Sequence, residues 1–84
     1  MSIAHAENVV NVWMSDGKPA RLIWQGARYR VADDPLRLSD LLFDVTHPPA
    51  IDGWRFRGVD ERGVSKQFDV LRTVRGWEMV RVSS

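Results

Sequence analysis

The chain contains no cysteine, and this absence excludes several kinds of stabilisation and chemistry. Without cysteine there are no disulfide bonds, no thiolate nucleophile and no zinc site that uses a sulfur ligand. Small secreted domains usually depend on such cross-links. Residues 1–7 also lack the basic start and the apolar stretch of a signal peptide, and no apolar run is long enough to span a bilayer. We therefore expect a cytoplasmic protein with no membrane contact.

Histidine is also scarce, and the two imidazoles, His5 and His47, lie far apart in the sequence. A zinc site normally requires three or four ligands. Asp44 and Asp52 are the carboxylates nearest to His47, but solvated loop residues explain this group more simply. We predict no metal site.

Motifs of catalysis and cofactor binding are missing as well. The serines have no histidine and carboxylate partners in an elbow motif, and the sequence contains neither a phosphate loop nor a dinucleotide fingerprint. A chain of 84 residues has little room for a deep cofactor pocket. We expect no cofactor and no enzymatic activity.

The composition is that of one ordinary folded domain. Of the 84 residues 44% are hydrophobic and 27% charged, which is far from the composition of a disordered chain. We expect a single β domain over residues 1–84, with residues 1–7 flexible and four tryptophans available for the core. The net charge of +1 is too small for bulk attraction to polyanions, so any electrostatic function depends on local patches.

Alternation of apolar and polar residues predicts strands, and glycine-containing turns separate most of them. The expected strands cover residues 8–14, 19–25, 28–32, 53–59, 64–74 and 77–82. Within residues 64–74 the alternation slips around Leu71 and Arg72, which predicts a bulge or a bend there. In the last strand Trp77 and Met79 compete with Val80 and Val82 for the buried side, so its register stays open.

Residues 33–50 interrupt the strands as an insertion. The leucines after Pro35 fall at helical spacing and predict a short helix from Pro35 to Phe43, with an irregular loop as the alternative. Together these patterns indicate a mainly β fold of about six antiparallel strands. We expect a small barrel or curled sheet, with an SH3-like barrel as the closest single type.

The first two hairpins resemble a functionally uncharacterised family of small bacterial domains. In that family a Gly-x-Pro-Ala turn leads into a strand with Trp, then Gly, then an Arg-Tyr-Arg-Val strand. The matching positions here are Gly17, Pro19, Ala20, Trp24, Gly26 and Arg28 to Val31, and Gly53-Trp54 and Trp77 to Val82 also look like the later strands. Some relatives lie beside DNA-repair polymerases or are fused to them. The resemblance therefore implies a role with nucleic acid or with a DNA-repair protein.

Arginine supplies ten of the twelve basic residues, and several arginines occupy outward positions of the expected strands. We call this group the arginine stripe, which consists of Arg21, Arg28, Arg30, Arg55 and Arg57. Arginine suits phosphate recognition and stacking on bases. If the second, third and fourth strands lie side by side, the stripe predicts a nucleic-acid-binding face. Trp13 and Tyr29 are the aromatic side chains expected to be free for stacking.

Two other interpretations remain open. Outward strand positions are polar in any case, and Asp60, Asp69 and Glu78 on neighbouring strands would pair with the arginines. In the other interpretation the domain binds a protein, or a second copy by strand addition. The contact residues would then be Trp13, Tyr29, His47, Pro48 and Pro49.

Overall fold

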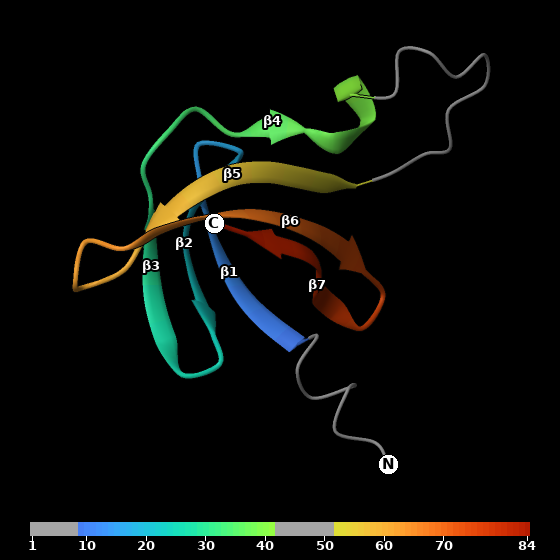
Figure 1. The fold of residues 1–84 in the computed structure, drawn as a ribbon. Helices are drawn as coiled ribbons and strands as arrows, with labels where there is room; N and C mark the ends of the chain where they lie inside the picture. The colour runs from blue at the N-terminus through green and yellow to red at the C-terminus, as the bar shows by residue number, and fades with distance from the viewer. Residues whose placement is uncertain (1–8, 42–51) are drawn as a thin grey trace.

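A computed structural model describes residues 9–41 and 52–84, so the predictions for residues 1–7, His5, His47, Pro48 and Pro49 lie outside the described residues. Seven strands and one short 3₁₀ helix make up this part of the chain (Figure 1). They are β1 (Val9–Ser15), β2 (Lys18–Trp24), β3 (Ala27–Val31), β4 (Leu36–Arg37), η1 (Leu38–Leu41), β5 (Gly53–Val59), β6 (Ser65–Thr73) and β7 (Gly76–Ser83). No helix among the described residues has the length and apolar character needed to cross a membrane.

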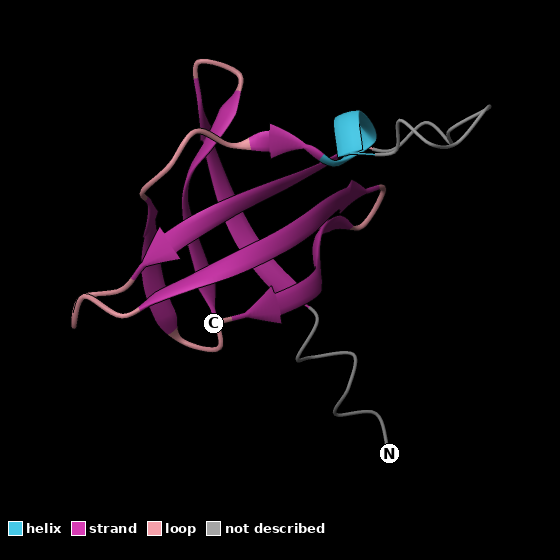
Figure 2. Ribbon diagram, turned by 45° about the horizontal axis from the view of Figure 1, so that its top comes forward, coloured by secondary structure: helices cyan, strands magenta, loops and turns pink. Residues whose placement is uncertain are grey.

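Six of the strands close into an antiparallel barrel. β1, β2 and β3 form one meander and β5, β6 and β7 a second, while β3 pairs with β5 and β7 pairs with β1. Figure 2 shows the two meanders wrapped around a common interior. Closure leaves few exposed sheet edges, which an open sheet of this size would present to solvent. The prediction of a small antiparallel barrel is confirmed.

The predicted helix from Pro35 to Phe43 is wrong over the residues that the structure describes. Leu36 and Arg37 instead form β4, which pairs with Arg55 and Trp54 of β5, and the 3₁₀ helix η1 follows. β4 occupies the part of the β5 edge that β3 leaves unpaired, because β3 ends at Val31 and pairs only with Gly58 and Val59 of β5. Pairing with this edge outweighs a weak local preference for helix.

Two tight turns shape the first meander as the sequence predicts. Asp16 and Gly17 have φ angles of 54° and 77°, and Gln25 and Gly26 have φ angles of 50° and 76°. Two successive residues in the left-handed region form the type I′ turn that suits a hairpin with a right-handed twist. Gly accepts this conformation without a steric penalty, and it follows the strained residue in both turns.

The predicted bulge at Leu71 and Arg72 is also wrong, since the irregularity lies on the partner strand. Asp69 is paired with Arg81 and Val70 with Met79, so Val80 is the additional residue. Val80 points outward and is 56% exposed. The extra residue shifts the alternation of β7 by one position. Both Met79 before it and Val82 after it therefore face the core, which resolves the conflict seen in the sequence.

The core is centred on Phe68 of β6, which is completely buried. Its ring meets Tyr29 of β3 edge-to-face at 4.8 Å and Trp24 of β2 at 6.0 Å, and lies 6.0 Å from Phe56 of β5. Such pairs add about 0.5–1.5 kcal/mol each to the burial of their area. Phe68 therefore joins the two meanders across the interior. Three of the four tryptophans pack into or against this core, and Trp13 does not.

Gly58 of β5 lies directly beneath this aromatic contact. A Cβ atom at position 58 would come within 2.9 Å of Phe68 Cε2 and 3.1 Å of Tyr29 Cβ. Gly58 is paired with Val31 of β3 and with Lys66 of β6, so it sits where the two meanders meet. The missing side chain allows the ring of Phe68 and the Cβ atom of Tyr29 to approach the backbone of β5.

We predict that Gly58→Ala destabilises the domain by about 1–3 kcal/mol, because the added methyl group overpacks the contact between Tyr29 and Phe68. Denaturation in urea measures the effect. Gly58→Ala combined with Phe68→Leu is the control, since a smaller side chain at position 68 makes room for the methyl group. The two changes must then cost less together than the sum of their separate effects. Strict additivity would contradict this role of Gly58.

Candidate functional site

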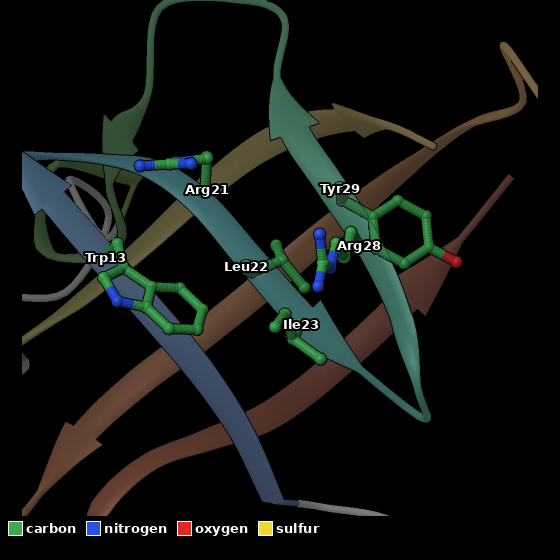
Figure 3. A pocket seen from close by; sticks show the side chains of 6 residues that line it. All are labelled: Trp13, Arg21, Leu22, Ile23, Arg28 and Tyr29. Atoms are coloured by element: carbon green, nitrogen blue, oxygen red, sulfur yellow. The ribbon is translucent and has the colours of Figure 1, made fainter. Parts of the chain in front are cut away.

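The outer surface of β1, β2 and β3 collects an exposed indole and three arginines. Cross-strand pairing places Trp13, Arg21 and Arg30 in one row, and Ile23 and Arg28 in the next row. Residues paired across neighbouring strands project from the same side of a sheet, and so do residues two positions apart along one strand. All five side chains therefore lie on the outer side. We call these five residues the Trp–Arg face. Figure 3 shows Arg21 extending from β2 toward β1, on which Trp13 lies.

The Trp–Arg face is hollowed rather than flat. A shallow depression of about 300 Å³ lies among Trp13, Arg21, Ile23 and Arg28, with Leu22 and Tyr29 also in its wall (Figure 3). A second depression of about 240 Å³ begins at the same two arginines and continues past Arg30 to residues 59–61 of the next meander. Their volumes lie at or below the lower end of the roughly 300–1,000 Å³ of small-molecule pockets. The site is a shallow groove open to solvent.

No counter-charge from the described part of the chain contacts the arginines of this face. In the part of the chain that the structure describes, Arg21, Arg28 and Arg30 make no ion pair and no side-chain hydrogen bond. Arg21 lies directly opposite Arg30 in the ladder. Like charges in directly opposite positions destabilise a sheet. The face is therefore electropositive at some cost in stability.

The two arginines of β5 behave differently, although β3 and β5 are neighbours as the stripe requires. Arg55 Nε and Nη2 donate to the two carboxylate oxygens of Asp69 at 2.8 and 2.9 Å. The hydrogen bond and the charge of this carboxylate raise the pKa of Arg55 above its ordinary value. Arg57 Nη1 donates to Ser65 Oγ at 3.0 Å. The arginine stripe is thus divided into three unpartnered members and two that already have partners.

Asp69 explains why Arg55 cannot be assigned to a ligand. Its side chain is only 8% exposed, and the bidentate guanidinium group compensates its burial. The expectation that acidic residues neutralise the arginines is therefore right for Asp69. It is not met by the other two residues, since within the described residues neither Asp60 nor Glu78 pairs with the stripe. Asp60 accepts from backbone N–H groups of its own turn instead.

The expectation that Tyr29 is free for stacking or for protein contact is wrong, because Tyr29 is almost entirely buried and only contributes to the wall of the groove. Its side chain is 5% exposed and is held edge-to-face against Phe68. Tyr29 is paired with Leu22, which also points inward, so the ladder directs both side chains into the core. Trp13, by contrast, is 46% exposed as predicted.

Ile23 was missed as a site residue by the reasoning from the sequence. It lies beside Arg28 in the ladder and lines the larger depression with Trp13. The outward position of Ile23 could be predicted from the alternation of the strand, because residues 21 and 23 lie on the same side. An apolar residue there interrupts a polar face, and this was the available signal.

Comparison with known proteins adds no assignment. No protein-family model, no curated protein and no solved structure matches the chain. The family resemblance of the hairpins stays a prediction. Within residues 9–41 and 52–84, no group of three or more His, Asp or Glu side chains comes together in a way that would hold a metal ion.

We predict that Arg55→Gln lowers the free energy of unfolding by about 1–3 kcal/mol, because it leaves the buried carboxylate of Asp69 without its charged partner. Arg28→Gln is the matched control: it removes the same charge from an exposed position and should change stability by less than about 0.5 kcal/mol. Urea denaturation of both variants measures the difference. Equal effects would show that the pair with Asp69 is not structural.

Proposed function

We propose that this domain is a non-catalytic binding module that contacts nucleic acid through the Trp–Arg face. The observation that carries the proposal is the set of three neighbouring guanidinium groups that have no carboxylate partner in residues 9–41 and 52–84. Guanidinium forks fit phosphate oxygens, and a phosphate backbone brings the negative charge that this face lacks. The absence of cysteine favours the cytoplasm as the place where this contact is made.

The local character of the charge supports this choice of partner. The net charge of the chain is only +1, so the attraction comes from the three arginines and not from the protein as a whole. Asp60 and Glu61 border the groove beside β3 and share a further depression with Arg28. Their negative charge limits the length of backbone that the groove can follow. We therefore expect modest affinity and contact with few phosphates.

The number of phosphate contacts gives a measurable salt dependence. Three contacts predict a slope of log affinity against log salt of about −2.7 for duplex DNA and about −2.1 for single strands. Affinity should then fall roughly 20- to 40-fold between about 50 and 200 mM salt. Fluorescence anisotropy with labelled DNA and RNA over this range measures the slope.

Replacing Arg21, Arg28 and Arg30 together by Gln should abolish this binding, because the phosphate contacts are lost. The variant should melt no earlier than the wild-type domain, since the repulsion between opposite arginines is removed as well. The control replaces three arginines elsewhere on the surface by Gln, namely Arg72, Arg75 and Arg81. Retained affinity in the first variant, or an equal loss in the control, would refute the proposal.

A second candidate function is protein contact by strand addition, and one feature of the barrel favours it. β1 is paired with β7 only at Val9 and Val10, so from Asn11 to Ser15 its edge beside β7 has no strand partner among the described residues. An extended segment of another chain, or of a second copy, pairs with such an edge through its backbone. Trp13 and Met14, which are 46% and 38% exposed, would provide side-chain contacts.

Strand addition predicts association that depends little on salt and survives loss of the arginines of the Trp–Arg face. Sedimentation velocity over a range of protein concentrations tests for a homodimer. Met14→Lys should prevent it, because a lysine on an open edge discourages pairing, whereas Val74→Lys places the same charge on the remote β6–β7 turn. A monomer at all concentrations would exclude self-association by this edge.

A further inference from the structure

The nucleic-acid function proposed above leaves Trp13 unexplained. An indole that is 46% exposed gives up much of the stabilisation that its burial would provide. The barrel has buried or half-buried positions for the other three tryptophans. Trp13 instead lies at one end of the row that contains two unpartnered guanidinium groups.

The spacing of this row fits one nucleotide with its neighbour. Adjacent strands lie about 4.7–4.9 Å apart, so Trp13 and Arg30 are separated by about 10 Å across the sheet, with Arg21 between them. A base stacked on the indole would hold its own phosphate beside Arg21 and direct the next one toward Arg30. The side chain of Ile23 borders the same depression and supplies apolar contact beside the base.

Stacking on Trp13 requires an unpaired base. In a duplex both faces of each internal base are covered by neighbouring bases, so the indole cannot reach them. Small barrels hold single strands by combining aromatic platforms with basic grooves. The groove of the Trp–Arg face has both features, since Trp13 provides an exposed aromatic ring and three arginines provide positive charge.

We propose that the Trp–Arg face selects single-stranded nucleic acid, with one unpaired base stacked on Trp13 and the flanking phosphates held by Arg21 and Arg30. This inference rests on the proposed nucleic-acid function and adds the class of substrate to it. The arginines should raise the affinity for any phosphate chain. Trp13 should raise the affinity only for polymers whose bases are accessible.

The test measures binding of four probes to the full chain. The first is an oligothymidylate of about ten nucleotides, a length within the roughly 4–16 nucleotides that a small barrel covers. The others are a blunt duplex with the same number of phosphates, inorganic polyphosphate of similar length, and a polyglutamate peptide. Wild-type protein should bind the oligothymidylate most tightly. Trp13→Leu should weaken this complex roughly 5- to 150-fold, the value of one base–aromatic stack. Its affinity for polyphosphate should not change.

Two further variants separate stacking from general apolar contact. Trp13→Phe retains an aromatic face and should keep most of the affinity for the oligothymidylate. Val80→Ala removes apolar surface from an equally exposed position on β7 and should have no effect. Quenching of indole fluorescence by the oligothymidylate should be present in the wild-type protein and reduced in Trp13→Leu. Thermal melting of each variant shows that the barrel is still folded.

The outcomes distinguish this inference from the function on which it rests. Equal affinity for all phosphate probes, with no effect of Trp13→Leu, would overturn the selection of single strands and leave phosphate binding by the arginines intact. Equal affinity for polyglutamate would overturn nucleic acid as the partner in favour of an acidic protein segment. No binding to any probe at about 50 mM salt would refute both proposals.

Discussion

The packing of Phe68 across the middle of the barrel is the contact on which the rest of the fold depends. The side chain comes from β6, and its ring partners come from β2, β3 and β5, so one residue connects both meanders. Gly58 permits this approach because it has no side chain to hold the rings away from the backbone. An 84-residue domain buries a smaller fraction of its surface than a large one does, and a central aromatic group compensates for part of this difference.

The same packing determines which residues form the candidate site. Once Leu22 and Tyr29 point toward Phe68, the alternating positions beside them must point outward. Those positions are Arg21 and Ile23 beside Leu22, and Arg28 and Arg30 beside Tyr29. A shift of one residue in the register would bury the arginines and expose the core, so the hydrophobic contacts enforce the position of the charged ones. The register of the meander therefore fixes the outward positions of the Trp–Arg face.

Local patterns in the sequence were sufficient for the strands and turns. Period-two alternation and glycine turns act over a few residues, and they placed six strands to within two residues at their ends. The features that sequence reasoning missed depend on distant partners. Leu36 and Arg37 form a strand because β5 offers an unpaired edge, and the bulge falls at Val80 because both halves of β7 must face one core. Neither requirement is visible within a short segment.

The candidate site, too, was predictable from the sequence only in part. That the stripe arginines lie on outward positions followed from parity alone, but their chemical availability did not. Arg55 and Arg28 have the same residue type and the same outward position, and only the ladder reveals that Arg55 lies opposite a buried carboxylate. The burial of Tyr29 follows from Phe68, a residue 39 positions later in the chain.

The energetic contrast between the two groups of arginines bears on what the face is for. A domain of this size has a total stability of about 4–13 kcal/mol. Opposition of Arg21 and Arg30 costs up to about 1 kcal/mol of it, and either residue could be exchanged for a neutral one on an exposed strand without loss of packing. The barrel neutralises Arg55, where a buried acid requires it, and among the described residues leaves Arg21, Arg28 and Arg30 without partners. Local arrangements that oppose stability are expected where a surface must remain available to a ligand. A phosphate chain bound along this row would reduce the repulsion between Arg21 and Arg30, because its negative charges would neutralise the two guanidinium groups.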